Sequence, residues 1–335
     1  MAMQILAGDI GGTNTRLICA GVSENGRHIL AEKNYPSANY SGLIQVIDVF
    51  LAEHEIAGPV DAACFAIAGP VESGVARVTN LPWVISEKEL INKLHTPRVK
   101  LINDFVAAAY GIPDLQESDI LLLQRGLAPD KKSVHSDAAI IGAGTGFGAS
   151  HRVWLNDGYR VFSSEAGHAG FAPENAEQNE LLAWLQTKHA HVSLEMLLSG
   201  IGLVTIYHFL CEVAGLPESM VINEAMQQTD PAQVITEQAL LENDVVCQRA
   251  LNVFIDIYGA AASNVVLHYY PVNELYIAGG IAPKIQDRML DQRFLQAFSN
   301  KGPMSANMKK ITIKLITQDK VGLHGALSQA QRYFI

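Results

Sequence analysis

Cysteine is scarce and scattered in this sequence of 335 residues. Its four cysteines, Cys19, Cys64, Cys211 and Cys247, form no C-x-x-C pair, which disfavours disulfides or a zinc site and favours buried thiols. Charged residues make up only 17%, with a net charge of −10, and this sign disfavours nonspecific binding of nucleic acid. Runs of about 18 uncharged apolar residues are absent, and the first ten residues lack a basic segment before Asp9. We therefore expect a cytosolic protein with no signal peptide and no membrane span.

The composition is that of a folded protein, with 49% hydrophobic residues, and not that of a disordered chain. The length exceeds the usual size of one hydrophobic core, which predicts two domains. Strand-like and helix-like segments alternate, which indicates an α/β fold. We expect a small domain at residues 1–110 and a large one at 111–335, hinged about a cleft, with the final residues packing back on the small domain. The polar stretch Pro129–Asp137 is the predicted linker.

A Walker sequence is also missing, so a nucleotide site in this chain would have no P-loop lysine. Two glycine-rich turns, Gly8–Asn14 and Gly142–Gly148, do occur, and each lies between apolar, strand-like runs, as in a β-hairpin. Glycine lets backbone amides approach phosphate oxygens, and threonine adds a hydroxyl donor. The repeated pattern predicts two related halves with a phosphate-binding turn in each. An ordinary tight turn with an Asx cap is the alternative for the first.

The second turn formally matches a dinucleotide-binding fingerprint, from Gly144 to Ala149. That fingerprint requires a helix immediately afterwards. Ser150–Leu155 instead has the pattern of a strand, which argues against a Rossmann site.

Asn103 and Asp104 stand where a strand meets a helix. A carboxylate at such a place can accept the proton of an attacking hydroxyl, while a neighbouring amide fixes another hydroxyl. Both residue types are also good helix N-caps, and locally the cap is the stronger interpretation.

Three further polar residues stand among small or apolar neighbours. Glu165 and His168 lie three residues apart between Gly and Ala, a pattern that favours close approach of a ligand. A satisfied structural pair is the alternative, and the glycines at 167 and 170 argue against a helical metal site. Glu195, beside an apolar run, has the local pattern of a solvated helix residue.

Taken together, these segments resemble the bacterial glucokinase family, within the superfamily of hexokinase, actin and heat-shock-protein ATPases. The matching segments, in chain order, are Gly8–Asn14, Thr79–Trp83, Ile102–Phe105, Gly142–Gly146, Glu165–His168, Leu198–Leu203 and Ala278–Ile281. They span almost the whole chain. Ala169–Glu180 holds no cysteine, whereas related repressor/ORF/kinase proteins carry a zinc motif there, so the resemblance is to the zinc-free members. Ile201 departs from the family pattern, in which proline is common.

The resemblance implies the two-domain actin-like ATPase (ribonuclease H-like) fold and transfer of the γ-phosphoryl group of ATP to the 6-hydroxyl of glucose. Asp104 is implied as general base, and Asp9 as the residue that holds Mg²⁺, directly or through water. The implied sugar-binding residues are Asn80, Asn103, Asp104, Glu165, His168 and Glu195. The implied ATP-binding residues are Gly8, Asp9, Ile10, Gly11, Gly12, Thr13, Gly144, Thr145, Gly146, Gly202, Gly279 and Gly280.

Two other functions remain open from the sequence. One is a kinase for another hexose or a hexosamine, because nothing shows how the sugar's 2-position is recognised. The other is a sugar sensor without turnover, against which stand the presence of Asp104 and the lack of a helix-turn-helix segment before residue 5. Family resemblance and the long apolar helix expected at Asp244–Tyr269 both favour a homodimer.

Overall fold

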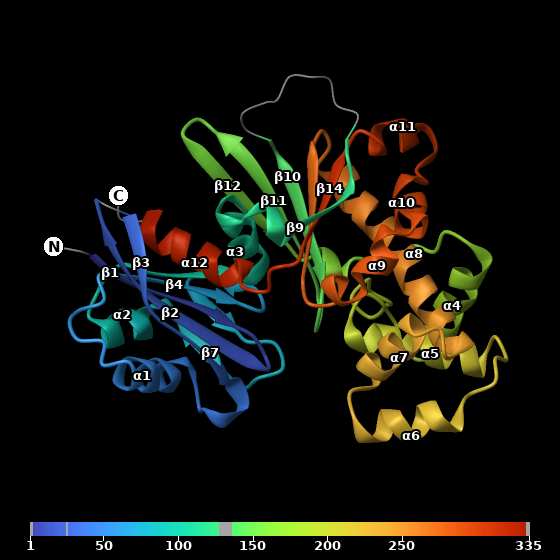
Figure 1. Ribbon diagram of the computed structural model, residues 1–335, viewed down its shortest axis with the longest axis horizontal. Coiled ribbons are helices and arrows are strands. Elements are labelled where there is room, and N and C mark those ends of the chain that lie inside the picture. The colour runs from blue at the N-terminus through green and yellow to red at the C-terminus, as the bar shows by residue number, and fades with distance from the viewer. Residues whose placement is uncertain (1–2, 25, 127–135, 333–335) are drawn as a thin grey trace. The chain divides into compact units, whose positions relative to one another are not determined.

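A computed structural model describes residues 3–24, 26–126 and 136–332 (Figure 1). The predicted linker Pro129–Asp137 falls largely outside these ranges. The chain forms two compact units. Unit 1 comprises Met1–Asp119, Val161–Ser163 and Gln318–Ile335, and unit 2 comprises Ile120–Arg160 and Ser164–Thr317. Unit 1 thus extends past residue 110 and includes the last residues of the chain.

Unit 1 is built on a mixed sheet in the order β3-β2-β1-β4-β8. Its strands are β1 (Met3–Ile10), β2 (Asn14–Ser23), β3 (Gly26–Pro36), β4 (Ala62–Ile67) and β8 (Val99–Asn103), beside a small sheet of β5 (Val71–Glu72), β6 (Val75–Arg77) and β7 (Val84–Ser86). Its helices are α1 (Leu43–Glu53), α2 (Glu87–Leu94), α3 (Asp104–Gly111) and α12 (Val321–Arg332). β1 and β2 form the predicted hairpin, and β4 and β8 run parallel to β1.

Helices cover both faces of this sheet. Phe50 of α1 and Leu90 of α2 pack with Leu6 and Phe65 on one face. On the other face Leu323 and the rest of the apolar side of α12 pack with α3 and with β1, and α12 is the red helix beside the blue strands in Figure 1. Apolar side chains on α12 therefore return the end of the chain to the N-terminal sheet.

Unit 2 repeats the arrangement in the order β12-β11-β10-β13-β14-β9. Its strands are β9 (Ile120–Gln124), β10 (Ala138–Ala143), β11 (Phe147–Leu155), β12 (Gly158–Ser164), β13 (Glu274–Ala278) and β14 (Thr312–Ile316). Its helices are α4 (Ala176–Gln186), α5 (Gly200–Glu212), α6 (Met220–Gln228), α7 (Pro231–Leu240), α8 (Val245–His268), α9 (Gln286–Leu290), α10 (Gln292–Ser299) and α11 (Ser305–Met308). The predicted α/β fold and its two related halves are confirmed.

The long apolar helix predicted at Asp244–Tyr269 is α8. By length and composition it is apolar enough to span a membrane, but 78% of its most apolar window is buried inside the protein. Its side chains pack with β10, β13, α5 and α10 in the core of unit 2. Because the core accounts for its apolar character, α8 gives no support to the expected homodimer.

Candidate functional site

In unit 1, two glycines of the first hairpin have no room for a side chain. A Cβ on Gly8 would lie 2.8 Å from Leu17 Cδ2 and 2.9 Å from Phe65 Cδ1, and one on Gly12 would lie 2.7 Å from the carbonyl oxygen of Thr79. Gly8 is therefore required by packing within the sheet, and Gly12 by close approach of the Thr79–Asn80 turn. Asn80, predicted as a sugar ligand, is thus brought beside the hairpin.

The tip of this hairpin is open. Gly11 N donates to Asn14 O at 2.9 Å and closes the turn, while Thr13 is exposed and Gly11 partly so. Ile10 is fully buried, and its carbonyl accepts from Ala68 N at 3.0 Å, so its predicted ATP contact has no exposed atom to carry it.

Asp9 lies one residue before the end of β1, with its carboxylate directed at the first turn of α12. A Cβ on Gly322 would stand 3.5 Å from Asp9 Oδ2. Burial raises the pKa of Asp9 to about 6, an effect that Arg16 opposes and Asp319 reinforces. The N-terminal end of a helix favours negative charge, yet this carboxylate holds its proton more tightly than an ordinary one.

Asn103 caps α3, as its sequence context favoured locally. Its Oδ1 accepts hydrogen bonds from Phe105 N at 2.9 Å and Val106 N at 3.3 Å, and its Nδ2 donates to Gly69 O at 3.3 Å. Asp104 is the first residue of the helix, and its Oδ1 accepts from Phe105 N at 3.0 Å. The cap fixes the start of α3, so the Asp104 carboxylate is held at the end of a parallel strand.

In unit 2, three predicted segments meet at the second hairpin. Gly144 N donates to Gly146 O at 2.8 Å, and Gly144 O accepts from Gly200 N at 3.0 Å. Ala143 O accepts from Ile281 N at 3.2 Å, which holds the loop after β13 against the same turn. Thr145, at the tip, is exposed.

The remaining predicted glycines differ in what requires them. Gly279 has φ +83°, and its Cβ would lie 2.5 Å from Ala143 O, whereas a Cβ on Gly280 meets no atom within 4 Å. Gly202 is buried in α5, and its amide donates to the Ser199 cap at 3.1 Å. Its backbone donor is therefore already used, so its predicted ATP contact rests on the resemblance alone.

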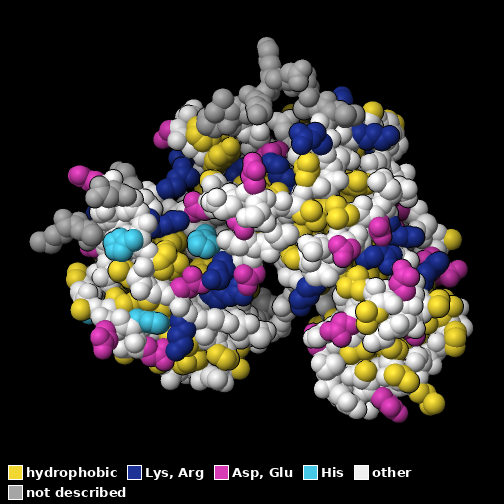
Figure 2. All heavy atoms as spheres, viewed as in Figure 1, with side chains coloured by type: hydrophobic (Ala, Val, Ile, Leu, Met, Phe, Trp, Pro, Cys, Tyr) yellow, Lys and Arg dark blue, Asp and Glu magenta, His cyan; other side chains and the backbone are white. Residues whose placement is uncertain are grey.

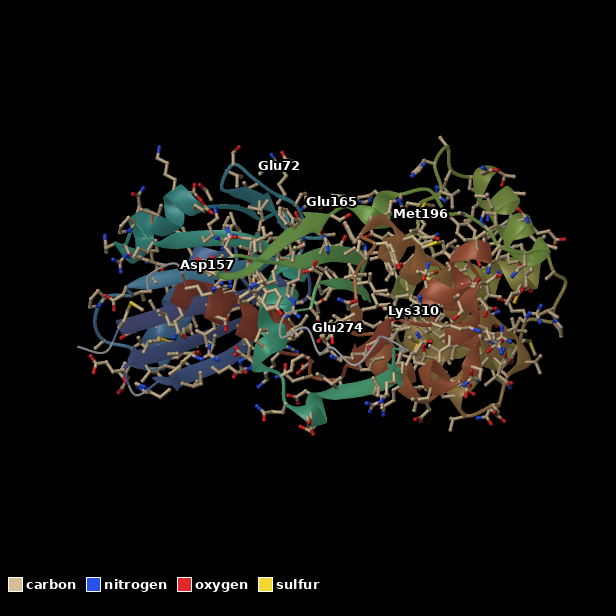
Figure 3. The ribbon with its side chains drawn as sticks, turned by 90° about the horizontal axis from the view of Figure 1, so that it is seen from above. Glu72, Asp157, Glu165, Met196, Glu274 and Lys310 are labelled. Atoms are coloured by element: carbon tan, nitrogen blue, oxygen red, sulfur yellow. The ribbon has the colours of Figure 1, made fainter. Side chains whose placement is uncertain are left out.

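Glu165 and His168 stand at the two ends of a single 3₁₀ turn, Ala166–His168, just after β12. Glu165, labelled in Figure 3, projects from this loop, and the two side chains are 57% and 67% exposed, with Oε2 and Nε2 4.0 Å apart. His191 Nε2 donates to the His168 carbonyl at 2.9 Å. The turn is held through its backbone, and both side chains remain accessible.

Glu195 lies in the loop between α4 and α5 and is not a helix residue. Its Oε2 accepts from Phe147 N at 2.9 Å, and its amide donates to Gly167 O at 2.9 Å. It thus joins the second hairpin to the Glu165–His168 turn. Sequence reasoning did not single out the Phe147 amide, because no local pattern links it to Glu195, 48 positions away.

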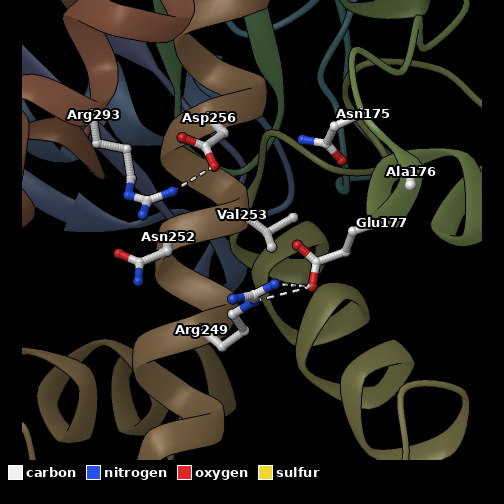
Figure 4. Close-up of a pocket in the computed structure, with 8 residues that line it drawn as sticks. All are labelled: Asn175, Ala176, Glu177, Arg249, Asn252, Val253, Asp256 and Arg293. Atoms are coloured by element: carbon white, nitrogen blue, oxygen red, sulfur yellow. Dashed lines mark hydrogen bonds and ion pairs between the residues drawn. The ribbon is translucent and has the colours of Figure 1, made fainter.

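One cavity of about 320 Å³ in unit 2 is lined by none of the predicted site residues. α4, α8 and α10 line it, and its charges are paired within the protein: Arg249 with Glu177 at 2.9 Å and Arg293 with Asp256 at 2.6 Å (Figure 4). Acidic and basic side chains also alternate over the face in Figure 2. Because these charged groups are paired with one another and none belongs to a predicted segment, the cavity is not assigned to the candidate site.

Comparison with known proteins supports these assignments of fold and family. A glucokinase family model matches residues 6–333. The glucokinase of Nostoc sp. strain PCC 7120 is 40% identical, covering 98% of this chain and 99% of the relative. A glucokinase structure from an Antarctic psychrotroph has a TM-score of 0.80 at 33% identity, covering 98% and 99% of the two chains.

More distant structures share the fold. The Balamuthia mandrillaris glucokinase in complex with glucose has a TM-score of 0.80 at 23% identity, covering 98% of this chain and 94% of the other. A ROK family glucokinase from Streptomyces griseus in complex with glucose and AMPPNP has a TM-score of 0.62 at 18% identity, covering 98% and 99%.

Two related sheets with glycine-rich hairpins define the actin-like ATPase fold of sugar kinases. Within that class, the chain belongs to the glucokinase family, as the model match over nearly its whole length shows.

Proposed function

We propose that this protein transfers the γ-phosphoryl group of ATP to the 6-hydroxyl of D-glucose. The observation that carries the proposal is Asp104, a carboxylate fixed at the start of α3 by the Asn103 cap in a member of the glucokinase family. The neighbours solved with glucose and with AMPPNP support the choice of sugar and of nucleotide.

Asp104 acts as the general base that takes the proton of the attacking hydroxyl. Its position suits this role because the pairing of β8 with β4 holds the backbone before Asp104, and helix α3 holds the backbone after it. Asn80, Asn103, Glu165, His168 and Glu195 bind the sugar's other hydroxyls. Glu165 and His168 are the most accessible of the charged groups in this set, as a ligand contact requires.

The two hairpins bind the phosphates of ATP at Gly8–Thr13 and at Gly144–Gly146. The Gly11 and Gly144 amides already donate within their turns, so the proposed backbone donors are those of the two tips, at residues 12–13 and 145–146. Amides already placed in the folded protein stabilise the charge of the transferring group without reorganising during the reaction. Gly279 and Gly280, in the loop that Ile281 N ties to the second hairpin, are proposed to contact the adenosine part of ATP. Gly202, in α5, is also assigned to ATP.

Asp9 is the proposed Mg²⁺ residue, directly or through water. The site fits a cation in one respect: burial disfavours the ionised carboxylate, whose pKa is raised to about 6, and a divalent cation would offset that cost. Among residues 3–24, 26–126 and 136–332 no group of three or more His, Cys, Asp or Glu side chains surrounds a metal position. When bound, Mg²⁺ would neutralise phosphate charge, and Asp9 is the residue of this chain that would hold the ion.

The test is to incubate the purified protein with Mg-ATP and a panel of hexoses and hexosamines and to follow ADP release. Glucose should give the highest kcat/KM, and Asp104→Asn should lower kcat by roughly two to four decades. Faster turnover of a hexosamine or mannose would indicate a different sugar kinase. Glucose binding by calorimetry without ADP release would indicate a sugar sensor.

We also propose that the protein is a cytosolic homodimer. Composition and family membership support this proposal, while the apolar helix α8 does not. Light scattering at micromolar concentration tests it, and a mass near the 36.3 kDa of one chain would contradict the dimer.

A further inference from the structure

The two glycines of the second hairpin differ in their surroundings. A Cβ on Gly146 would overlap Glu195 Oε2 and lie 2.9 Å from Glu195 Cδ, whereas a Cβ on Gly144 would have Gly280 N, at 3.8 Å, as its nearest neighbour. Neither glycine has a left-handed φ, so backbone strain requires glycine at neither. Gly144 is left with space that a ligand can approach, while the space beside Gly146 is filled by Glu195.

The Glu195 carboxylate is held on several sides within unit 2. Its Oε2 accepts from the amide of Phe147, the residue after Gly146. A Cβ on Gly167 would lie 3.5 Å from the same oxygen and would overlap Phe147 O. Gly146 thus leaves room for the carboxylate oxygen, and a backbone donor fixes it, whereas glycine at 167 is required by the Phe147 carbonyl.

We propose that Gly146 is a positioning residue for the sugar: the lack of a side chain there leaves the space in which the hairpin holds the Glu195 carboxylate, while its backbone amide keeps the phosphate role proposed above. The inference rests on the proposed function, in which Glu195 binds glucose. It follows that the hairpin assigned to ATP also sets one of the sugar contacts. A side chain at residue 146 would move Glu195 and weaken glucose binding before it affected ATP.

Gly146→Ala is a favourable test because the three atoms nearest the added Cβ all belong to the end of the Glu195 side chain. The fold should persist while the carboxylate shifts. A hydrogen bond to a charged group contributes about 1.5–3 kcal/mol, so we expect the Kd for glucose, measured by calorimetry without ATP, to rise roughly 10- to 100-fold. The KM for ATP should stay within about threefold of wild type, because an ATP contact is not what the added methyl disturbs.

The matched control is Gly144→Ala in the same turn. Its Cβ meets open space on the protein side, so the Kd for glucose should stay within about twofold of wild type, while the KM for ATP rises through obstruction of phosphate. The inference thus predicts that Gly146→Ala raises the Kd for glucose alone and that Gly144→Ala raises the KM for ATP alone.

A double-mutant cycle shows whether Gly146 acts through Glu195. Glu195→Ala removes the side chain that the new Cβ would displace, so Gly146→Ala should cause no further loss of glucose affinity in that background. Glu195→Gln, which retains an oxygen acceptor for Phe147 N, should bind glucose better than Glu195→Ala. If Gly146→Ala alone does not fold, the inference requires that it fold in the Glu195→Ala background.

Three outcomes would overturn the inference. They are wild-type glucose affinity in Gly146→Ala, additive losses in the cycle, and failure to fold in both backgrounds. Failure of the wild-type protein to bind glucose at all would contradict the proposed function itself, which separates the two claims.

Discussion

The two units share one backbone plan and differ in where they carry acidic side chains. In each, a central strand pairs antiparallel with the next strand and parallel with a later one. The parallel neighbour is followed in each case by a glycine with positive φ: Gly69, two residues after the end of β4, and Gly279, directly after β13. A Cβ on either glycine would lie too close to a carbonyl oxygen, at 2.7 Å for Gly69 and 2.5 Å for Gly279. The structural repeat of the two units therefore extends to the loops after these strands.

The ends of corresponding strands differ in chemistry. β1 carries Asp9 one residue before its end, where β10 carries Gly142, and β8 runs into Asp104 where β14 ends at Ile316. Unit 2 takes its acidic candidates, Glu165 and Glu195, from loops. Asp104 follows a strand end and is the proposed base, whereas Glu165 is exposed in a loop and is proposed only to contact the sugar. The comparison therefore predicts a loss of kcat when Asp104 is changed and a loss of glucose affinity when Glu165 is changed.

The largest expected effect comes from Asp104. Asp104→Asn keeps an oxygen to accept from Phe105 N and removes the base, so kcat should fall by roughly two to four decades with glucose still bound. Glu165→Gln, in the loop of unit 2, should raise the KM for glucose about tenfold and leave kcat within tenfold. Steady-state kinetics with both substrates measures the split. An equal loss of kcat in the two variants would contradict the assignment of Asp104 to catalysis and of Glu165 to sugar binding.

The next effect concerns the helix that closes unit 1. A Cβ on Gly325 of α12 would overlap Ala107 O and lie 2.8 Å from Gly111 N in α3. Because these are backbone atoms, Gly325→Ala should lower the free energy of unfolding by about 3 kcal/mol. Urea denaturation measures it. The control is Gly322→Ala on the same helix, where the Cβ makes an ordinary contact and stability should be unchanged or slightly higher; equal losses would contradict the packing argument.

A smaller effect, on the pH dependence of stability, is expected from Asp9, whose counterpart in unit 2 is Gly142. The folded pKa of Asp9 is about 6 against an ordinary 3.8, so the folded protein binds this proton more tightly than the unfolded chain. Stability therefore falls as pH rises from about 4 to 6, and at pH 7 the ionised carboxylate costs up to roughly 3 kcal/mol.

Asp9→Asn should remove this cost. Without Mg²⁺, its melting temperature should exceed that of wild type at pH 7 and match it near pH 4, while Mg-ATP turnover falls. Thermal melts across this pH range check the sign, and a variant less stable than wild type at pH 7 would contradict it.

The smallest effect is expected at the pair that ties the segment before α12 to β2. Arg16 donates to both the carboxylate and the carbonyl of Asp319 at 2.6 Å, but the Asp319 side chain is 69% exposed. Arg16→Ala should cost at most about 1 kcal/mol, and less at high salt. Lys33→Ala, which removes an exposed pair with Glu53 in the same unit, is the control; a loss similar to that of Gly325→Ala would show that Arg16 does more than pair at the surface.

Local patterns in the sequence were sufficient for the elements and for the family. Apolar runs on both sides of glycine predicted the hairpins β1–β2 and β10–β11, because strand alternation and turn chemistry act over a few residues. The same holds for α8, whose apolar character gives its length. The order of seven short motifs identified the family, and placed Asp104 at a strand end.

Tertiary structure alone decided what each of these residues contacts. Gly144 and Gly146 are equivalent in the sequence, yet only Gly146 adjoins Glu195. α8 could face a partner or a core, and it lies in the core. Periodicity gives the apolar face of a helix but not what covers it. Contacts between residues far apart in the chain are set by the packing of whole elements, and no local preference encodes them.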